Sequence, residues 1–257
     1  MFRLSICAET FFCDLPFIER VRKISKAGFL VDFWRWTDRD IEAIAADSSI
    51  RIGGFTGYTV GSLVHPDGLK SFLDGIEQTV PVAKKLRCRE LVLSTGEIDH
   101  SGKVVHAIAP NPITRWISAY KGLCRIAELA EKHDLVYSLE PLNTKRDHAG
   151  YPLARVEDGV RLIEEVGSPR IKLLLDIYHT QVEEGNVTQV IRDFGKFVGY
   201  VHVADVPGRH EPGTGEINYP HVARALRDVA YDGVVGMEAY PQDDPARAMN
   251  RFREIFA

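Results

Sequence analysis

Eight short β-rich runs alternate with amphipathic helical stretches along the chain, and this alternation is the feature that most limits its possible folds. Parallel neighbouring strands need a crossover segment between them, usually a helix, so the alternation predicts one parallel sheet covered by helices. The predicted strands are Leu4–Glu9, Leu30–Trp36, Ile50–Phe55, Glu90–Ser94, Leu135–Glu140, Ile171–Asp176, Val198–Ala204 and Val234–Glu238.

The segments between these runs carry the apolar spacing of helices. We expect helices at Pro16–Ala27, Asp67–Leu86, Pro112–His133, Val156–Val166, Val187–Lys196, Pro220–Val229 and Pro245–Phe256. In Pro112–His133 apolar residues from Ile113 to Ala130 recur at helical spacing, which predicts a single buried face that includes Trp116, Ile117 and Tyr120. Eight β-α units in 257 residues match an α/β fold of the (β/α)₈ TIM barrel type, with a doubly wound open sheet as the alternative.

The connections that leave the strands are long and polar, whereas those that leave the helices are short. The long ones are Gly53–Pro66, Thr95–Asn111, Pro141–Arg155 and Asp205–Tyr219. In a barrel such loops gather at the carboxyl-terminal rim, where active sites are built. No linker or shift in composition divides the chain, so residues 1–257 are predicted to form one catalytic domain.

Composition narrows the choice of partner and compartment. With 32 Lys and Arg against 36 Asp and Glu, the chain has no general basic field for nucleic acid or a membrane surface, which favours a small-molecule partner. Cys7, Cys13, Cys88 and Cys124 form no C-x-x-C pair, which predicts reduced, mostly buried thiols in a cytoplasmic protein. The amino terminus lacks the pattern of a secretion signal, and a homo-oligomer remains open.

The last four predicted strands each end with a side chain that can bind a metal: Glu140, Asp176, His202 and Glu238. Taken singly, an acid at a strand end is more simply a solvated terminus or a helix cap, and a strand histidine a core residue with a hydrogen bond. Period-two alternation nevertheless turns these positions towards the barrel interior. Three buried carboxylates that converge there would repel one another unless a cation offsets them.

Three carboxylates and one imidazole form a hard, oxygen-rich donor set. This set suits one divalent ion, Mn²⁺, Mg²⁺ or Co²⁺, although Zn²⁺ accepts the same donors. Such an ion acts as a Lewis acid on a carbonyl and the neighbouring hydroxyl. Glu140 and Glu238 would then flank the substrate and move a proton between two of its carbons.

The rim loops add groups that could orient a substrate. Arg209 could bind a substrate carboxylate or form a surface salt bridge with Glu211 or Asp205. His179 follows Asp176 by three residues and could reach a substrate oxygen or make a loop hydrogen bond. Lys145 and Arg146 are weaker anion-binding candidates or solvated charges. A group of aromatic residues could wall the pocket or belong to the core: Phe11, Phe12, Trp34, Trp36, Phe55 and Tyr58.

Several of these segments together resemble the hydroxypyruvate isomerase family, within the xylose isomerase-like TIM barrels. They are Glu140-Pro-Leu-Asn, Asp176-Ile-Tyr-His179, the loop Ala204–Tyr219 and Gly-Met-Glu238. The resemblance implies that Glu140, Asp176, His202 and Glu238 are metal ligands, that the two glutamates are the acid/base pair, and that His179 and Arg209 contact substrate. The implied reaction interconverts hydroxypyruvate and tartronate semialdehyde through an enediolate.

Rival functions remain open at this stage. A 2-oxo-tetronate isomerase and a ketose 3-epimerase belong to the same superfamily, and the epimerases share a histidine at the position of His202. The AP endonuclease branch needs further histidines, and Leu91-Val-Leu-Ser-Thr-Gly and Glu216-Ile-Asn218 supply none where they would be wanted. A barrel without catalytic activity is the alternative outside the enzymes, and the intact set of four metal-binding residues argues against it.

Overall fold

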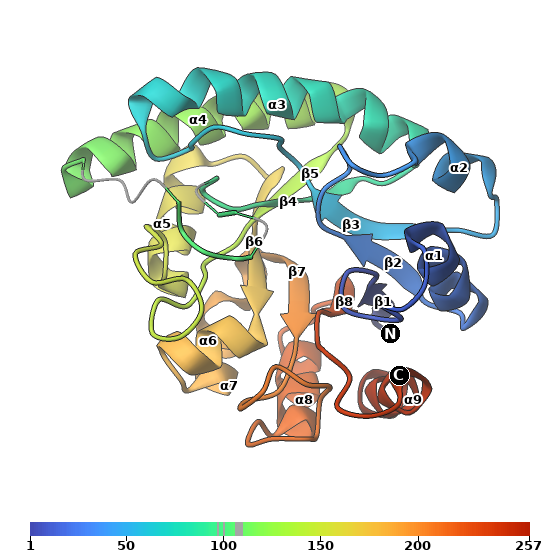
Figure 1. Ribbon diagram of the computed structural model, residues 1–257. Helices are drawn as coiled ribbons and strands as arrows, with labels where there is room; N and C mark the ends of the chain where they lie inside the picture. Colours follow the sequence, from blue (N-terminus) through green and yellow to red (C-terminus); the bar gives the residue numbers. More distant parts are fainter. Residues whose placement is uncertain (97, 100, 106–109) are drawn as a thin grey trace.

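The computed structural model describes residues 1–96, 98–99, 101–105 and 110–257. These residues form a closed barrel of eight strands in which every strand is parallel to both neighbours (Figure 1). The strands are β1 (Arg3–Cys7), β2 (Leu30–Phe33), β3 (Ile52–Thr56), β4 (Glu90–Leu93), β5 (Val136–Leu139), β6 (Ile171–Asp176), β7 (Val198–Val203) and β8 (Val234–Met237). The predicted TIM barrel is therefore confirmed and the open sheet excluded.

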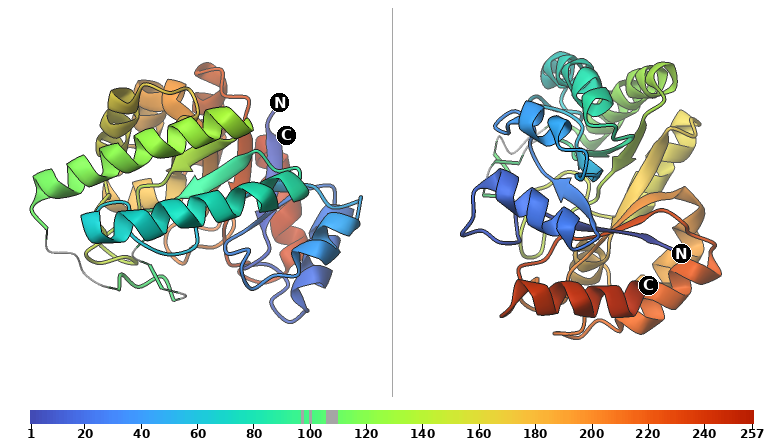
Figure 2. Two further views of the ribbon diagram at one scale, coloured as in Figure 1. Left: turned by 90° about the horizontal axis from the view of Figure 1, so that it is seen from above. Right: turned by 90° about the vertical axis from the view of Figure 1, so that its right-hand side faces the viewer.

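Helices between the strands cover the outside of the barrel. They are α1 (Phe17–Lys26), α2 (Ile41–Ala46), α3 (Pro66–Lys85), α4 (Pro112–His133), α5 (Val156–Val166), α6 (Ile177–Glu183), α7 (Val187–Phe194), α8 (Tyr219–Asp228) and α9 (Pro245–Phe256), with a short 3₁₀ turn at Gly195–Phe197. The two longest, α3 and α4, lie side by side on one flank (Figure 2). Helices α2 and α6 were not predicted, because each is too short to show a helical repeat in sequence.

Most of the predicted strands run past the observed ones at their carboxyl ends, although Ile171–Asp176 matches β6 and Ile50–Phe55 stops one residue before the end of β3. The segment predicted as Leu30–Trp36 stops at Phe33, and Glu140 and Glu238 each come directly after a strand instead of within it. Their backbones still follow the sheet, since the Glu140 N–H donates to the Leu93 carbonyl and the Glu238 N–H donates to the Val203 carbonyl. The difference arises because the rim is where the ladder of hydrogen bonds ends while the side chains still point inward.

Helix α4 corrects one prediction about packing. The apolar series from Ile113 to Ala130 does not form a single buried face. Leu123, Ala127 and Ala130 are buried, but another part of the series is exposed. The exposed residues are Ile113, Trp116, Ile117 and Tyr120. The buried residues of α4 include the small residues Ser118, Ala119 and Gly122, while the larger apolar residues of its first turns face outward.

The apolar interior has two parts. The larger lies between the barrel and its helices, and the smaller, made of Leu174, Tyr200 and Val234, lies inside the barrel below the rim. Phe2 and Phe256 pack ring against ring at 6.1 Å, which brings the two ends of the chain together (Figure 1). The inner cluster closes the barrel from below, so the rim is the open end of the barrel.

The cysteines and helices bear on two further predictions. All four thiols are free, with Cys7 and Cys88 buried, Cys124 half-buried and Cys13 exposed, so half of them, not most, are buried. Within the described ranges, no helix combines the length and the apolar character needed to cross a membrane.

Candidate active site and metal centre

The four predicted metal-binding residues come together at the rim, where the ends of β5, β6, β7 and β8 lie side by side. Asp176 is the partner of His202 in the β6–β7 ladder, and His202 is the partner of Gly236 in the β7–β8 ladder. Glu238 lies two residues beyond Gly236 on the same inward face, and Glu140 projects from the neighbouring end of β5. Neighbouring parallel strands lie about 4.8 Å apart, so side chains at matched ends must meet.

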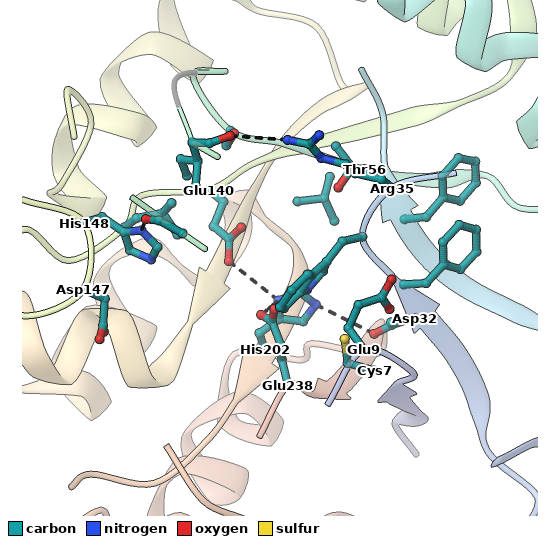
Figure 3. Close-up of a pocket in the computed structure, with 18 of the residues that line it drawn as sticks. Cys7, Glu9, Asp32, Arg35, Thr56, Glu140, Asp147, His148, His202 and Glu238 are labelled. Atoms are coloured by element: carbon teal, nitrogen blue, oxygen red, sulfur yellow. Dashed lines mark hydrogen bonds and ion pairs between the residues drawn. The ribbon is translucent and has the colours of Figure 1, made fainter. Parts of the chain in front are cut away.

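The ligand atoms of these four side chains lie within 4.8 Å of one another. His202 Nδ1 is 3.6 Å from Glu140 Oε1 and 3.3 Å from Glu238 Oε2 (Figure 3). All four residues are buried, and both His202 Nδ1 and Glu140 Oε1 lack a hydrogen-bond partner. Orphaned buried polar atoms that face the centre of a carboxylate cluster are what a cation site requires.

Asp176 divides its two oxygens between the helix and the site. Its Oδ1 accepts hydrogen bonds from the backbone N–H groups of Tyr178 and His179 and thereby caps α6. Its Oδ2 lies 3.7 Å from His179 Nε2 and 3.9 Å from Arg209 Nη2, on the side of the cluster. The helix-cap interpretation of this residue and the metal-site interpretation are therefore both compatible with the geometry, because they use different atoms.

Burial and charge shift the two glutamates in opposite directions. Burial raises the pKa of Glu140, and the facing His202 only partly opposes this shift. Burial would also raise the pKa of Glu238, but Arg209, His202 and the Trp34 indole together lower it to about 2. Glu238 therefore has the more cationic surroundings of the two.

The same surroundings also shift the pKa values of the other two members of the cluster, Asp176 and His202. Burial raises the pKa of Asp176 to about 6, although Arg209 opposes it. Burial would lower the pKa of His202, but the carboxylates of Asp32, Glu140 and Glu238 raise it well above its usual value. The buried carboxylates of the cluster are thus stabilised by a nearby positive charge, whether a proton or a cation.

A tightly bonded loop places Arg209 at the site. The Asp205 carboxylate accepts from the N–H groups of Val206, Gly213 and Ile217 and so ties the loop to itself. The Arg209 carbonyl accepts from the Tyr240 N–H, which fixes the loop to the chain beyond β8. Arg209 itself sits at φ 56°, a left-handed conformation that aims its side chain back over the rim.

The Arg209 guanidinium lies 3.2 Å from Glu238 Oε2 and is only 18% exposed. This contact excludes the surface salt bridge to Glu211 or Asp205 as its main role, because those carboxylates accept backbone N–H groups of the loops. Arg209 Nη2 also lies 3.4 Å from His179 Nε2. Arg209 is therefore part of the cluster's charge balance.

His179 is buried on α6 and makes the hydrogen bonds to a loop residue that were one of its two expected roles. Its Nδ1 is 2.7 Å from the Asn143 side-chain amide and 3.3 Å from the Asn143 backbone N–H. Burial and the nearby Arg209 lower its pKa well below the usual value. A neutral ring that accepts at Nδ1 carries its proton on Nε2, which faces Asp176 and the cavity.

A cavity of about 710 Å³ opens over the cluster. Among the predicted aromatic residues, Trp34, Phe55 and Tyr58 line it, whereas Phe11, Phe12 and Trp36 do not. Arg146 also lines it, while Lys145 donates instead to the Glu183 carbonyl. The predicted loop Thr95–Asn111 borders the cavity, but its residues 97, 100 and 106–109 lie outside the described ranges.

Three features of the site were missed from sequence. Trp34 was expected only as an apolar wall, yet its indole N–H donates to Glu238 Oε1 at 2.5 Å. Glu9, at the end of β1, lines the cavity and accepts from Arg39 at 2.9 Å. Asp32 is buried inside the barrel next to His202. A carboxylate within an apolar strand was the available signal for Asp32, but its partners come from distant strands.

Comparison with known families places these observations in context. The family model described as "Xylose isomerase-like TIM barrel" matches residues 17–255. The chain belongs to the xylose isomerase-like TIM barrel family. The expected fold family is thus confirmed, and the four clustered side chains lie at the rim of a barrel of this family.

Relatives within the xylose isomerase-like family carry isomerase names. A Homo sapiens protein named "Putative hydroxypyruvate isomerase" is 34% identical over 74% of this chain and 68% of its own length. The hydroxypyruvate isomerase of Escherichia coli (strain K12) is 28% identical over 94% of this chain and 95% of its own. The resemblance to the hydroxypyruvate isomerases is therefore confirmed.

A solved structure from Brucella melitensis, described as an AP endonuclease of family 2, superposes on this chain with a TM-score of 0.89. It is 27% identical to this chain, with 99% of each chain covered. In the described part of this chain, one group of three or more His, Cys, Asp or Glu side chains is placed to hold a metal ion. It consists of Glu140, Asp176, His202 and Glu238.

Proposed function

We propose that this protein is a divalent-metal-dependent isomerase of small hydroxy-oxo acids that interconverts hydroxypyruvate and tartronate semialdehyde. The observation that carries the proposal is the convergence of three carboxylates and one imidazole within 4.8 Å, in a buried cluster at the open end of the barrel. The hydroxypyruvate isomerase names of its relatives support the choice of substrate class.

The residues present fit a divalent ion. His202 Nδ1 and Glu140 Oε1 are buried without hydrogen-bond partners and face the same point, and oxygen-rich donors suit Mn²⁺, Mg²⁺ or Co²⁺. Glu140, Asp176, His202 and Glu238 would hold the ion. When bound, it would supply Lewis-acid polarisation of the substrate carbonyl and adjacent hydroxyl.

Glu140 and Glu238 are the proposed acid/base pair. They project from β5 and β8 on either side of His202, so a substrate above the histidine lies between two carboxyl groups. One glutamate takes the proton from C3 of hydroxypyruvate, and it or its partner returns a proton to C2. The hydroxyl proton passes from O3 to O2, which turns the alcohol and ketone into an aldehyde and an alcohol with no net change in composition.

Arg209 and His179 are the proposed substrate contacts. The Arg209 guanidinium is held at the cavity by its loop and can bind the substrate carboxylate through two parallel hydrogen bonds. The neutral His179 ring directs Nε2–H towards the cavity and can donate to a substrate oxygen. Together they would hold the acid end of the substrate so that C2 and C3 lie beside the glutamates.

The test is an assay of metal-free protein reconstituted separately with Mn²⁺, Mg²⁺, Co²⁺ and Zn²⁺. Substrates are hydroxypyruvate, a four-carbon 2-oxo acid and neutral ketoses, with Glu140→Gln and Glu238→Gln as controls for a contaminating enzyme. The proposal expects metal-dependent turnover of hydroxypyruvate that both variants lose. Turnover that survives metal removal, or activity restricted to ketoses, would overturn it.

One observation favours a second candidate, a ketose 3-epimerase. The cavity of about 710 Å³ is far larger than a three-carbon acid needs, since pockets of ~300–1,000 Å³ commonly hold much larger ligands. The D-psicose 3-epimerase of Enterocloster bolteae is 33% identical over 48% of this chain. An epimerase would use the same two glutamates but would not need a carboxylate on its substrate, so the substrate panel separates the two activities.

A further inference from the structure

Asp32 is a buried carboxylate on β2 that the proposed reaction does not use. It lies inside the barrel beside the four candidate metal ligands, and its residue is 5% exposed. Its Oδ1 accepts two hydrogen bonds, from Ser5 Oγ at 2.5 Å and from the Tyr200 hydroxyl at 2.7 Å. Its Oδ2 is buried and has no hydrogen-bond partner. A buried carboxylate oxygen without a hydrogen-bond partner lowers the stability of the fold, so its presence calls for an explanation.

The free oxygen faces His202. Asp32 Oδ2 lies 3.7 Å from His202 Nε2, while the opposite ring nitrogen, Nδ1, faces Glu140 and Glu238 (Figure 3). A neutral imidazole has a proton on one nitrogen and a lone pair on the other. An acceptor on the Nε2 side favours the proton there, which leaves the Nδ1 lone pair directed at the cluster.

The barrel is shaped to admit this carboxylate. A Cβ atom at Gly236 would lie 2.4 Å from Asp32 Oδ2, and one at Gly53 would lie 2.5 Å from Asp32 Oδ1. Both distances are shorter than non-bonded atoms tolerate, so any larger residue at position 53 or 236 would displace the Asp32 carboxylate. Tyr200 packs edge-on against the His202 ring at 5.4 Å and fills the space below it. Residues from β1, β2, β3, β7 and β8 thus meet around one carboxylate.

We propose that Asp32 is a positioning residue for metal binding: its negative Oδ2, 3.7 Å from His202 Nε2, keeps the ring proton on that nitrogen and so presents the Nδ1 lone pair to the ion. Ser5 and Tyr200 fix the carboxylate through its other oxygen. Carboxylates in this relation to a ligating histidine strengthen metal binding in many proteins. This inference rests on the metal site of the proposed function and is independent of the substrate.

The experiment measures Mn²⁺ binding to metal-free protein by calorimetry, together with thermal unfolding with and without Mn²⁺. We expect Asp32→Asn to raise the Mn²⁺ dissociation constant about 10- to 100-fold, because loss of such a partner has this effect on metal affinity. The stabilisation that Mn²⁺ gives should shrink in parallel. Tyr200→Phe is the matched control, since it removes an Oδ1 partner but leaves the Oδ2–His202 pair.

Three outcomes decide the matter. Weaker Mn²⁺ binding by Asp32→Asn with a near-normal unfolding temperature of the metal-free form, and a smaller effect of Tyr200→Phe, supports the inference. Unchanged Mn²⁺ affinity in Asp32→Asn, whatever its stability, overturns the inference and leaves the proposed function intact. If the unmodified protein binds none of Mn²⁺, Mg²⁺, Co²⁺ or Zn²⁺, the proposed function fails and this inference fails with it.

Discussion

The two halves of the barrel rim differ in how they carry their polar groups. The ends of β5 to β8 supply Glu140, Asp176, His202 and Glu238, one from each strand, with ligand atoms within 4.8 Å of one another. The ends of β1 to β4 supply no such set among the described residues. Instead they contribute single groups: Glu9 paired with Arg39, Trp34 on Glu238, and Asp32 beneath His202.

This difference separates two ways of building a site. In the half formed by β5 to β8, inward-facing side chains from the ends of four neighbouring strands meet, because adjacent parallel strands end at the same rim. In the other half each group acts through a long-range contact, and Trp34 and Glu238 are 204 residues apart. We therefore expect the first half to perform the chemistry and the second to support and shape it, and the same type of substitution should have different effects in the two halves.

The largest effect is expected for Glu238→Gln. The substitution keeps the size of the side chain but removes a proposed acid/base group, which typically contributes ~10²–10⁴-fold in rate. We expect kcat for hydroxypyruvate in the Mn²⁺-loaded enzyme to fall by about 10³-fold. Glu140→Gln should have a similar effect. A variant within tenfold of the parent would show that its glutamate does not move the proton.

Arg209→Ala should separate the acid substrates from the neutral ones. Arg209 is the proposed partner of the substrate carboxylate, and loss of a buried charge pair commonly removes ~2–5 kcal/mol of binding. We expect kcat/KM for hydroxypyruvate to fall by about 100-fold, with little change for a neutral ketose. Steady-state kinetics on both substrates provide the measurement, and equal losses would refute the proposed carboxylate contact.

Trp34→Phe should have a moderate effect on catalysis from the other half of the rim. It removes the indole N–H that donates to Glu238 Oε1 but retains an aromatic ring in the cavity wall. A hydrogen bond to a charged group contributes ~1.5–3 kcal/mol, so kcat should fall by about 10- to 150-fold while KM changes little.

Trp36→Phe is the matched control for this prediction. Its indole N–H donates to Thr79 Oγ1 at 3.0 Å, and Trp36 does not line the cavity. Its kcat should remain near that of the parent. Equal losses in the two variants would mean that the Trp34–Glu238 hydrogen bond has no particular role in the reaction.

Glu9→Gln should change stability more than catalysis. Burial raises the pKa of Glu9 to about 7 from 4.5, although Arg39 opposes the shift. Between these values the folded state binds more protons than the unfolded state, so the free energy of unfolding falls as pH rises from 4.5 to 7. If the pKa of Glu9 moves from 4.5 to about 7 on folding, the free energy of unfolding changes by about 3 kcal/mol at most across this pH range.

Denaturant unfolding of both proteins from pH 4 to 8 checks this prediction. Glutamine cannot ionise, so the stability of Glu9→Gln relative to the parent should grow through this pH window and then level off, while kcat stays close to the parent value. A difference in stability that does not vary with pH would show that Glu9 titrates normally in the folded protein.

Much of the fold was accessible from sequence because it depends on local periodicity. The alternation of strand and helix patterns predicted all eight strands, and Ile171–Asp176 was placed with its observed ends. Helix α4 shows the limit: its apolar series predicted one buried face, but small residues pack against the barrel and Trp116 and Tyr120 face outward. Which side of a helix is buried is decided by what lies beneath it.

The site divides in the same manner. The four candidate metal ligands could be predicted because each lies at the end of an apolar strand, and neighbouring parallel strands end at the same rim. They are Glu140, Asp176, His202 and Glu238. Arg209 was found as a rim residue, but its contact with Glu238 depends on a loop held by Asp205. The hydrogen bond from Trp34 to Glu238 and the contacts of Asp32 with Tyr200 and His202 could not be predicted, since each joins strands far apart in the chain.

The sequence by itself determined the barrel, its open end and the four side chains that converge there, because periodicity and strand ends are local properties that a closed parallel sheet converts directly into position. Only the tertiary structure decided which ring nitrogen of His202 faces the cluster, which groups hold Glu238 and where Asp32 lies. Those relations are set by barrel closure, which brings β1 and β2 against β7 and β8 and leaves room at Gly53 and Gly236 for a buried carboxylate.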